Sequence, residues 1–189
     1  NAAYIWAGSM PRSPTHRFED MMTETKLWKD DAFVADSWRH AEEDDGEGHV
    51  IIPLAAYLAL SDDERVAASN RLGVLIAPGD KLEAIEPHLD RLPLVALSFP
   101  AYNDGRSHSK AALLKSRHGF KGEVRAVGDV LVDQIPLLLR NGFDTLEVTN
   151  AVAQKRLAEG KSSAVNIFYQ PATASAKPAA GYSWRRLPG

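Results

Sequence analysis

The segment from Gly119 to Val148 constrains the fold more than any other part of the chain. It reads GFKGEVRAVGDVLVDQIPLLLRNGFDTLEV, in which a short β-branched strand is followed by a Gly-Asp turn, a helical stretch, an Asn-Gly stop and a second strand. Such punctuation at both junctions is typical of a βαβ unit, whose two strands lie parallel in one sheet. The sequence therefore predicts an α/β protein.

The same alternation continues on both sides of this unit. The expected strands are near-continuous apolar runs, as is usual where both faces of a parallel sheet are covered. They span residues 50–52, 73–77, 94–99, 124–127, 145–148 and 165–169. About six βα units in roughly 130 residues are too few for a complete eight-stranded barrel, which takes about 250 residues. We therefore expect a mostly parallel sheet, either doubly wound or an incomplete TIM-like barrel.

The two ends of the chain differ from this regular middle. Residues 1–21 show neither strand nor helix periodicity, and we expect a poorly ordered extension or a remnant of cloning, with a functional arm as the alternative. Residues 27–38 predict an N-terminal hairpin with a Lys-Asp-Asp turn. Residues 171–189 are rich in Ala, Pro and Ser and predict a flexible tail. The expected α/β domain is residues 22–170.

Pro136 breaks a local rule, because it lies inside the helix that Asp129 is expected to cap. Proline removes a backbone hydrogen bond there, at a cost of about 3 kcal/mol in a regular helix. The helix must either bend at Pro136 or begin later, near Asp133. The periodicity of the neighbouring residues favours the bend.

Composition excludes several classes of function. The chain has 189 residues and a net charge of -3, which gives no support for binding nucleic acid or an anionic membrane. It contains no cysteine, so disulfides, thiolate nucleophiles and cysteine-bound zinc or iron–sulfur clusters are excluded within this chain. No apolar run approaches the roughly 20 residues of a membrane span. With no secretory signal in the sequence, we expect a cytoplasmic protein.

Polar residues follow several expected strands. The carboxyl ends of parallel strands lie at one edge of the sheet, where α/β proteins usually place their sites. The candidate catalytic carboxylates at this edge are Asp129, Asp133 and Asp104. Paired carboxylates can act as acid and base, although Asp129 as a helix cap and Asp133 as a first-turn charge is the simpler interpretation, which we prefer.

Arg125 is unusual for a buried strand, because an unpaired buried guanidinium is very unfavourable. It could form an ion pair with Asp129, Asp104 or Glu147, the interpretation that we favour. Alternatively, two arginines and the N–H groups of a helix start could clamp an anion. The anion-binding candidates are Arg106, Arg125, Ser109 and Gly128.

Familiar cofactor motifs do not occur. The sequence lacks the glycine patterns of a phosphate-binding loop, a dinucleotide site and a hydrolase nucleophile elbow. The six histidines are scattered without the spacing of metal ligands, so no metal site is predicted. The identity of any cofactor stays open.

A long pattern from Phe99 to Phe143 resembles a known family. The family pattern is approximately F-P-x-F-x-D-G-R-G-x-S-x-A-x-L-L-R-x-R-x-G-x-x-G-E-L-R-A-x-G-D-V-L-x-D-Q, followed by C-G-F-D. The matching residues are Asp104, Gly105, Arg106, Ser109, Arg117, Gly119, Gly122, Glu123, Arg125, Gly128, Asp129, Asp133, Gln134, Gly142, Phe143 and Asp144. The resemblance is to a bacterial domain-of-unknown-function family. Two departures are Ser107 in place of a glycine and Asn141 in place of a frequent cysteine.

The resemblance implies a role in sulfur metabolism. Members are often labelled as oxidoreductases of sulfite reduction, and their genes tend to lie beside those for sulfite reductase and phosphoadenylylsulfate reductase. We therefore expect an accessory protein of assimilatory sulfate and sulfite reduction that binds a reductase or a sulfur oxyanion. The alternative is an enzyme, an oxidoreductase or an acid–base catalyst, with its site at the carboxyl edge of the sheet.

Overall fold

A computed structural model describes residues 22–101 and 104–160, with the side chains of residues 22 and 23 left out. The extension expected at residues 1–21, the strand expected at 165–169 and the tail expected at 171–189 lie outside the described residues. Everything below concerns the described part of the chain.

One mostly parallel sheet organises this part of the chain. Its eight strands follow the order β2-β1-β8-β7-β6-β5-β4-β3. The strands β3 to β8 run parallel to one another, whereas β1 pairs antiparallel with both β8 and β2. The strands are β1 (Met22–Lys29), β2 (Ala32–Val34), β3 (Trp38–His40), β4 (His49–Pro53), β5 (Leu72–Ile76), β6 (Leu94–Phe99), β7 (Glu123–Gly128) and β8 (Thr145–Asn150).

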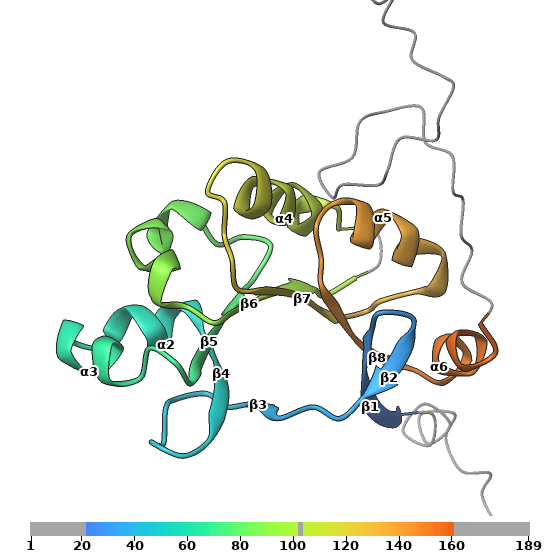
Figure 1. Cartoon of the computed structure of the whole chain (residues 1–189), viewed down its shortest axis with the longest axis horizontal. Coiled ribbons are helices and arrows are strands. Elements are labelled where there is room, and N and C mark those ends of the chain that lie inside the picture. Colours follow the sequence, from blue (N-terminus) through green and yellow to red (C-terminus); the bar gives the residue numbers. More distant parts are fainter. Residues whose placement is uncertain (1–21, 102–103, 161–189) are drawn as a thin grey trace, which may run out of the picture.

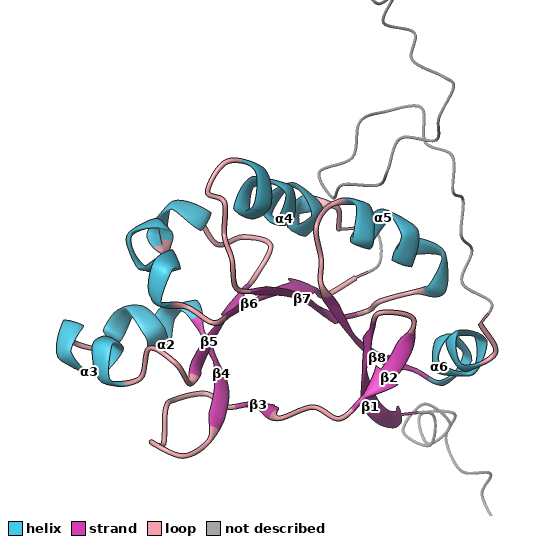
Figure 2. Ribbon diagram, viewed as in Figure 1, coloured by secondary structure: helices cyan, strands magenta, loops and turns pink. Residues whose placement is uncertain are grey.

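The helices lie on the outer side of the sheet, which curls into a half-barrel (Figures 1 and 2). The α-helices are α2 (Leu54–Ala59), α3 (Asp62–Ala67), α4 (Arg106–Ser116), α5 (Ile135–Arg140) and α6 (Ala151–Ala158). The 3-10 helices are η1 (Leu82–Ala84), η2 (Glu86–Arg91) and η3 (Val132–Gln134). A doubly wound sheet would carry helices on both faces. Of the two expected architectures, the structure therefore has the incomplete barrel.

The regular alternation of strand and helix is interrupted twice. The parallel strands β3 and β4 are joined by a helix-free acidic loop at residues 41–48, and β5 and β6 are joined by 3-10 turns, with Pro87 in the first turn of η2. The strand β3 is missing from the sequence prediction. It has only three residues, and they are partly or fully exposed, so no apolar run marks it.

The two faces of the sheet differ in what covers them. On β6, Val95, Leu97 and Phe99 face the helices and belong to the main core. Their neighbours Leu94 and Ala96 face the inside of the curl, where they form a second apolar cluster with residues of β4, β5 and β7. The period of two that separates these sets is the ordinary alternation of side chains along a strand.

The predicted bend at Pro136 is wrong. The α-helix begins at Ile135, after the 3-10 turn of η3, so that Pro136 lies in the first helical turn. Proline is tolerated there because first-turn N–H groups have no partner within the helix. The later start was the alternative that the sequence left open. Asp129 accordingly does not cap this helix, whose N-cap residue is Gln134.

Gly128 ends β7 where the chain passes very close to β6. Its φ is +106°, and a Cβ atom added there would lie 2.4 Å from the carbonyl oxygen of Phe99. The next N–H, of Asp129, donates to that same oxygen at 2.8 Å. Only glycine fits this combination of backbone conformation and contact.

We predict that Gly128→Ala lowers the free energy of unfolding by about 1–3 kcal/mol, the cost of placing a side chain in a left-handed conformation. Gly105→Ala is the matched control, because Gly105 has φ -79° and nothing lies within 4 Å of its added Cβ. It should change stability by less than about 0.5 kcal/mol. Urea unfolding measures both, and equal losses would contradict the assignment.

Candidate functional site

At the carboxyl edge of the sheet, Arg106 and Asp104 form an ion pair. Arg106 donates from Nε to Asp104 Oδ1 at 2.9 Å and from Nη2 to Asp104 Oδ2 at 2.6 Å. This pairing lowers the pKa of Asp104 from 3.8 to about 2, because the guanidinium stabilises the carboxylate. The side chain of Arg106 is 63% exposed. The two predicted residues thus meet each other at the surface.

The other predicted residues of this edge are spread over three elements. Ser109 is exposed on α4, Gly128 ends β7, and Asp129 follows it beside Phe99. Asp133 is exposed in η3. Because no helix begins at Asp129, Asp129 and Asp133 are not stacked on one helical turn as the sequence suggested. Among the predicted residues of this edge, the structure shows a direct contact between Asp104 and Arg106.

Two further side chains at this edge were not anticipated. Lys110 on α4 donates to the carbonyl oxygens of Ala77 and Pro78 at 2.7 and 3.0 Å, which covers the end of β5. Burial lowers the pKa of Lys110. Burial also lowers the pKa of His108, whose ring nitrogen lies 3.0 Å from the side-chain nitrogen of Asn141. Both groups serve contacts between α4 and its neighbours.

Arg125 lies elsewhere, on the inner face of the half-barrel. It lies within β7, four residues before Asp129. Four residues span about 13 Å along a strand. Its side chain is 1% exposed and contacts three carboxylates. The contacts are Glu123 at 2.8 Å, Asp36 at 2.7 Å and Glu147 at 3.1 Å. Glu147 is one of the three ion-pair partners that we expected for Arg125 from the sequence.

The contacts of Arg125 extend to two more residues. His40 Nε2 lies 3.0 Å from both carboxylate oxygens of Glu147. Thr145 donates its hydroxyl to Glu123 at 2.6 Å. We call this group the inner-face cluster; it consists of Asp36, His40, Glu123, Arg125, Thr145 and Glu147.

The electrostatics of the inner-face cluster disfavour an anion. Three carboxylates surround one guanidinium, so the group carries a net charge of -2 while His40 is neutral. Burial alone would lower the pKa of Arg125, but the charges of Glu123 and Asp36 raise it, so the guanidinium stays protonated. Arg125 therefore meets its need for counter-ions within the protein.

The inner-face cluster has the parts of an acid–base site. The His40 side chain is 40% exposed, whereas Glu147 behind it is 7% exposed. A histidine whose ring nitrogen is held by a carboxylate, with the carboxylate held in turn by a third group, is a common arrangement for proton transfer. Its sequence signal is the alternation of polar residues in two apolar strands, Glu123-x-Arg125 and Thr145-x-Glu147.

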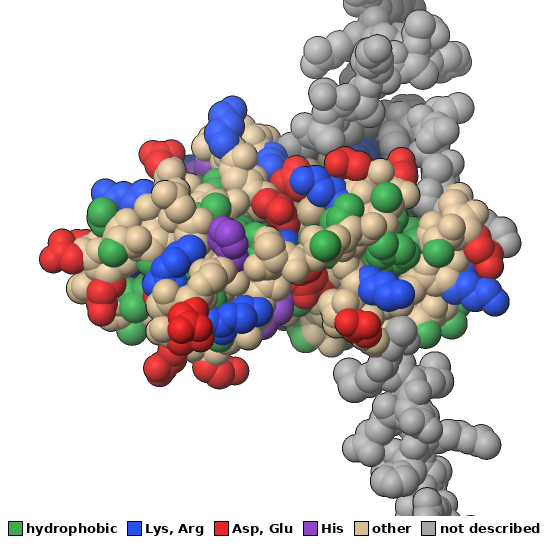
Figure 3. Space-filling model, turned by 60° about the horizontal axis from the view of Figure 1, so that its bottom comes forward, with side chains coloured by type: hydrophobic (Ala, Val, Ile, Leu, Met, Phe, Trp, Pro, Cys, Tyr) green, Lys and Arg blue, Asp and Glu red, His purple; other side chains and the backbone are tan. Residues whose placement is uncertain are grey.

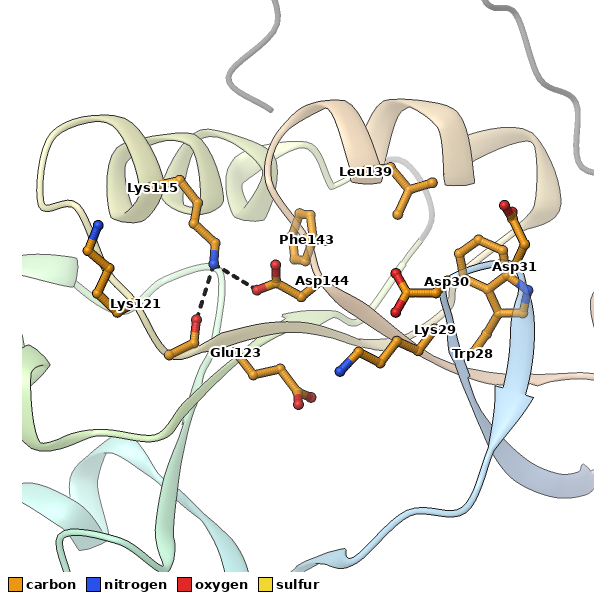
Figure 4. A pocket seen from close by; sticks show the side chains of 11 residues that line it. Trp28, Lys29, Asp30, Asp31, Lys115, Lys121, Glu123, Leu139, Phe143 and Asp144 are labelled. Carbon is orange, nitrogen blue, oxygen red and sulfur yellow. Dashed lines mark hydrogen bonds and ion pairs between the residues drawn. The ribbon is translucent and has the colours of Figure 1, made fainter. Parts of the chain in front are cut away.

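A pocket of about 490 Å³ opens at the amino-terminal edge of β7 and β8, opposite the expected edge (Figure 4). Lys115 donates there to Asp144 at 2.7 Å and to the carbonyl of Gly122 at 3.1 Å. Glu123 belongs both to this pocket and to the inner-face cluster. The lining residues are Trp28, Lys29, Asp30, Asp31, Lys115, Lys121, Gly122, Glu123, Leu139, Phe143 and Asp144. Four carboxylates outnumber three lysines, so the pocket has no preference for anions.

Charge is mixed on the visible surface too. Figure 3 shows acidic and basic side chains interspersed on the face that comes forward, without a broad patch of one sign. Among residues 22–101 and 104–160, no group of three or more His, Cys, Asp and Glu side chains could hold a metal ion. Within the same residues, no helix is long and apolar enough to cross a membrane.

Comparison with known proteins places more than half of the chain in one family. The model of the family described as "Bacterial protein of unknown function (DUF934)" matches residues 73–180. The match includes all but the first residue of β5, the strands β6 to β8 and the helices between them. No curated protein matches the sequence.

We predict that Arg125→Met lowers the free energy of unfolding by about 3–5 kcal/mol at pH 7, because three carboxylates would be left without their counter-ion. Arg106→Gln is the control and should have little effect, since its ion pair is solvent-exposed. Similar losses in both variants, measured by urea unfolding at pH 7, would show that Arg125 has no special role.

We also predict that the Asp104 carboxyl titrates near the pKa of about 2 and moves back towards 3.8 in Arg106→Gln. A depressed folded-state pKa means that the ion pair stabilises the protein above about pH 4 and ceases to do so as the pH falls through 2. Carboxyl-carbon NMR titration measures the shift. Arg39→Gln should leave the Asp104 titration unchanged, and a titration near 3.8 in the unmodified protein would refute the pairing.

Proposed function

Because this chain belongs to the DUF934 family of bacterial proteins of unknown function, we propose that it is an accessory protein of assimilatory sulfate and sulfite reduction. The family resemblance motivates the pathway, through the labels and gene neighbours of its members. The protein acts by binding a reductase, either sulfite reductase or phosphoadenylylsulfate reductase. It does not capture a sulfur oxyanion by itself.

The observation that carries this choice is the pairing of both candidate arginines. Arg106 already binds Asp104 through two hydrogen bonds, and Arg125 is enclosed by three carboxylates. A sulfite or sulfate ion would have to displace these carboxylates, and it would meet a negative net charge at the inner-face cluster. An oxyanion clamp is therefore the less favoured form of the accessory role.

A binding experiment tests this function. The tagged protein, immobilised on beads, should retain one of the two purified reductases, whereas heat-denatured protein on the same beads should retain neither. Calorimetry of the isolated protein with sulfite and with sulfate should give no binding heat. Failure of the folded protein to retain either reductase would reject the accessory role. An oxyanion binding heat that disappears in Arg106→Gln would restore the clamp.

A second function is favoured by one specific contact, the bond between His40 and Glu147. In an enzyme, His40 would accept and return a proton at its accessible ring, Glu147 would orient that ring, and Arg125 would fix Glu147. These contacts support a proposal of the inner face as the alternative catalytic site. The residues at the carboxyl edge, Asp104, Asp129 and Asp133, would then have no part in the reaction.

Growth on sulfate as the only sulfur source separates these sites. In a strain that lacks the protein, His40→Gln should fail to restore growth if the inner face is catalytic, because glutamine can bond to Glu147 but cannot transfer a proton. Asp129→Asn should restore growth, with both variants folded by circular dichroism. Full growth with His40→Gln would eliminate the enzymatic alternative on the inner face.

A further inference from the structure

The two edges of the sheet are joined by a very short connection. The strands β2 and β3 lie at opposite ends of the strand order, yet only residues 35–37 separate them in the chain. This connection runs across the open side of the curl, from β2 to β3 (Figure 1). We call residues 35–40, which are this connection and β3, the strap.

Two polar contacts tie the strap to the middle of the sheet. The Asp36 carboxylate accepts from Arg125 on β7 at 2.7 Å, and its other oxygen accepts from the backbone N–H of Trp38 at 3.0 Å. His40 contacts Glu147 on β8 at 3.0 Å. Both contacts lie on the inner face of the half-barrel, so they link the strap to β7 and β8.

An apolar contact accompanies these two. Trp38 packs on the inner cluster of Ile51, Leu94 and Ala96. It lies so close to β5 that a Cβ added at Gly73 would be 3.3 Å from its ring. The Trp38 ring also lies 4.9 Å from that of His49. Trp38 therefore covers the apolar half of the inner face, beside the polar half that Asp36 and His40 cover.

The backbone attachment of the strap is weak by comparison. The strand β3 pairs only with β4, over three residues, and five of the six strap residues are exposed. The inner-face residues beneath the strap are buried: Arg125 is 1% exposed and Ala96 is 0% exposed. Segments with short ladders and exposed backbone open at a lower free energy than the core of the same sheet.

We propose that the strap opens as a unit, with the rest of the sheet intact, and thereby exposes the inner-face residues Glu123, Arg125, Thr145 and Glu147. The inner face is thus a gated surface, closed by the protein's own Asp36 and His40. A ligand that keeps it open would have to replace these groups, with an acceptor for Arg125 and a hydrogen-bond donor for Glu147. This inference does not depend on the proposed role in sulfur metabolism.

The absence of cysteine from the sequence allows a direct test by thiol labelling. Ala96→Cys reports on the inner face under the strap. Ala126→Cys is its matched control, since Ala126 is also 0% exposed but lies in the helix-covered core. In native buffer, Ala96→Cys should react with a chromogenic disulfide at least about tenfold faster than Ala126→Cys, because strap opening is less costly than global unfolding.

Loosening the strap should widen this difference. Adding Asp36→Asn and His40→Gln should accelerate labelling of Ala96→Cys by about another tenfold and leave Ala126→Cys unchanged. Arg39→Gln is the control on the same strand, because Arg39 pairs with Asp45 at the surface. Equal labelling of the two cysteines with the native strap would overturn the proposal. If the Asp36→Asn and His40→Gln changes unfold the protein, the comparison of Ala96→Cys with Ala126→Cys, both with the native strap, still tests whether the strap opens.

Discussion

The buried guanidinium of Arg125 is the interaction on which the polar part of the inner face depends. Its charge is placed where water does not reach, so the surrounding chain must supply acceptors. Glu123 comes from the same strand and Glu147 from the next, but Asp36 comes from the far edge of the sheet. Satisfying one side chain therefore draws the connection between β2 and β3 over the inner face. The position of the strap over the inner face follows from this requirement.

The inner face is divided because the barrel is incomplete. In a closed eight-stranded barrel, layers of apolar side chains fill the interior. Here the strands β4 to β6 retain an apolar inner surface, covered by Trp38, whereas β7 and β8 carry charged and hydroxyl groups. The polar part tolerates water at the side of His40, which is the most exposed member of the group. The open architecture thus makes room for charge where a complete barrel would have a hydrocarbon core.

The fold was readable from the sequence wherever burial on the outer face was strong. Residues such as Val95 and Leu97 produce apolar runs that mark β6, and the same holds for β5, β7 and β8. The strand β3 escaped prediction because pairing with β4, and not burial, makes it a strand. Pro136 was interpreted as a defect, although it stands where a helix begins. Pattern alone does not fix the first residue of a helix to within one turn.

The candidate site was less accessible to prediction. The sequence indicated that Arg125 needs a partner, because charge in a buried strand is costly. It could not identify Asp36, which is 89 positions away in the segment that the sequence predicts to be an N-terminal hairpin. The rule that sites lie at the carboxyl edge directed attention to Asp104 and Arg106, which in fact satisfy each other. The alternation of polar residues in β7 and β8 was the available signal for the inner face.

The pairing of β1 with β8 has a consequence for how the chain matures during synthesis. The strand β1 pairs on one side with β2, which follows it directly, and on the other side with β8, the last described strand, so this second edge of β1 stays without its partner until β8 has left the ribosome. Contacts between such distant segments form slowly, because much loop entropy must be lost before they stabilise anything. The growing chain therefore carries the β1–β2 hairpin with one edge of β1 unpaired through most of its translation. Among the strand pairs of the described residues, β1 and β8 are the farthest apart in the sequence, so a chaperone has the longest time to act on this edge.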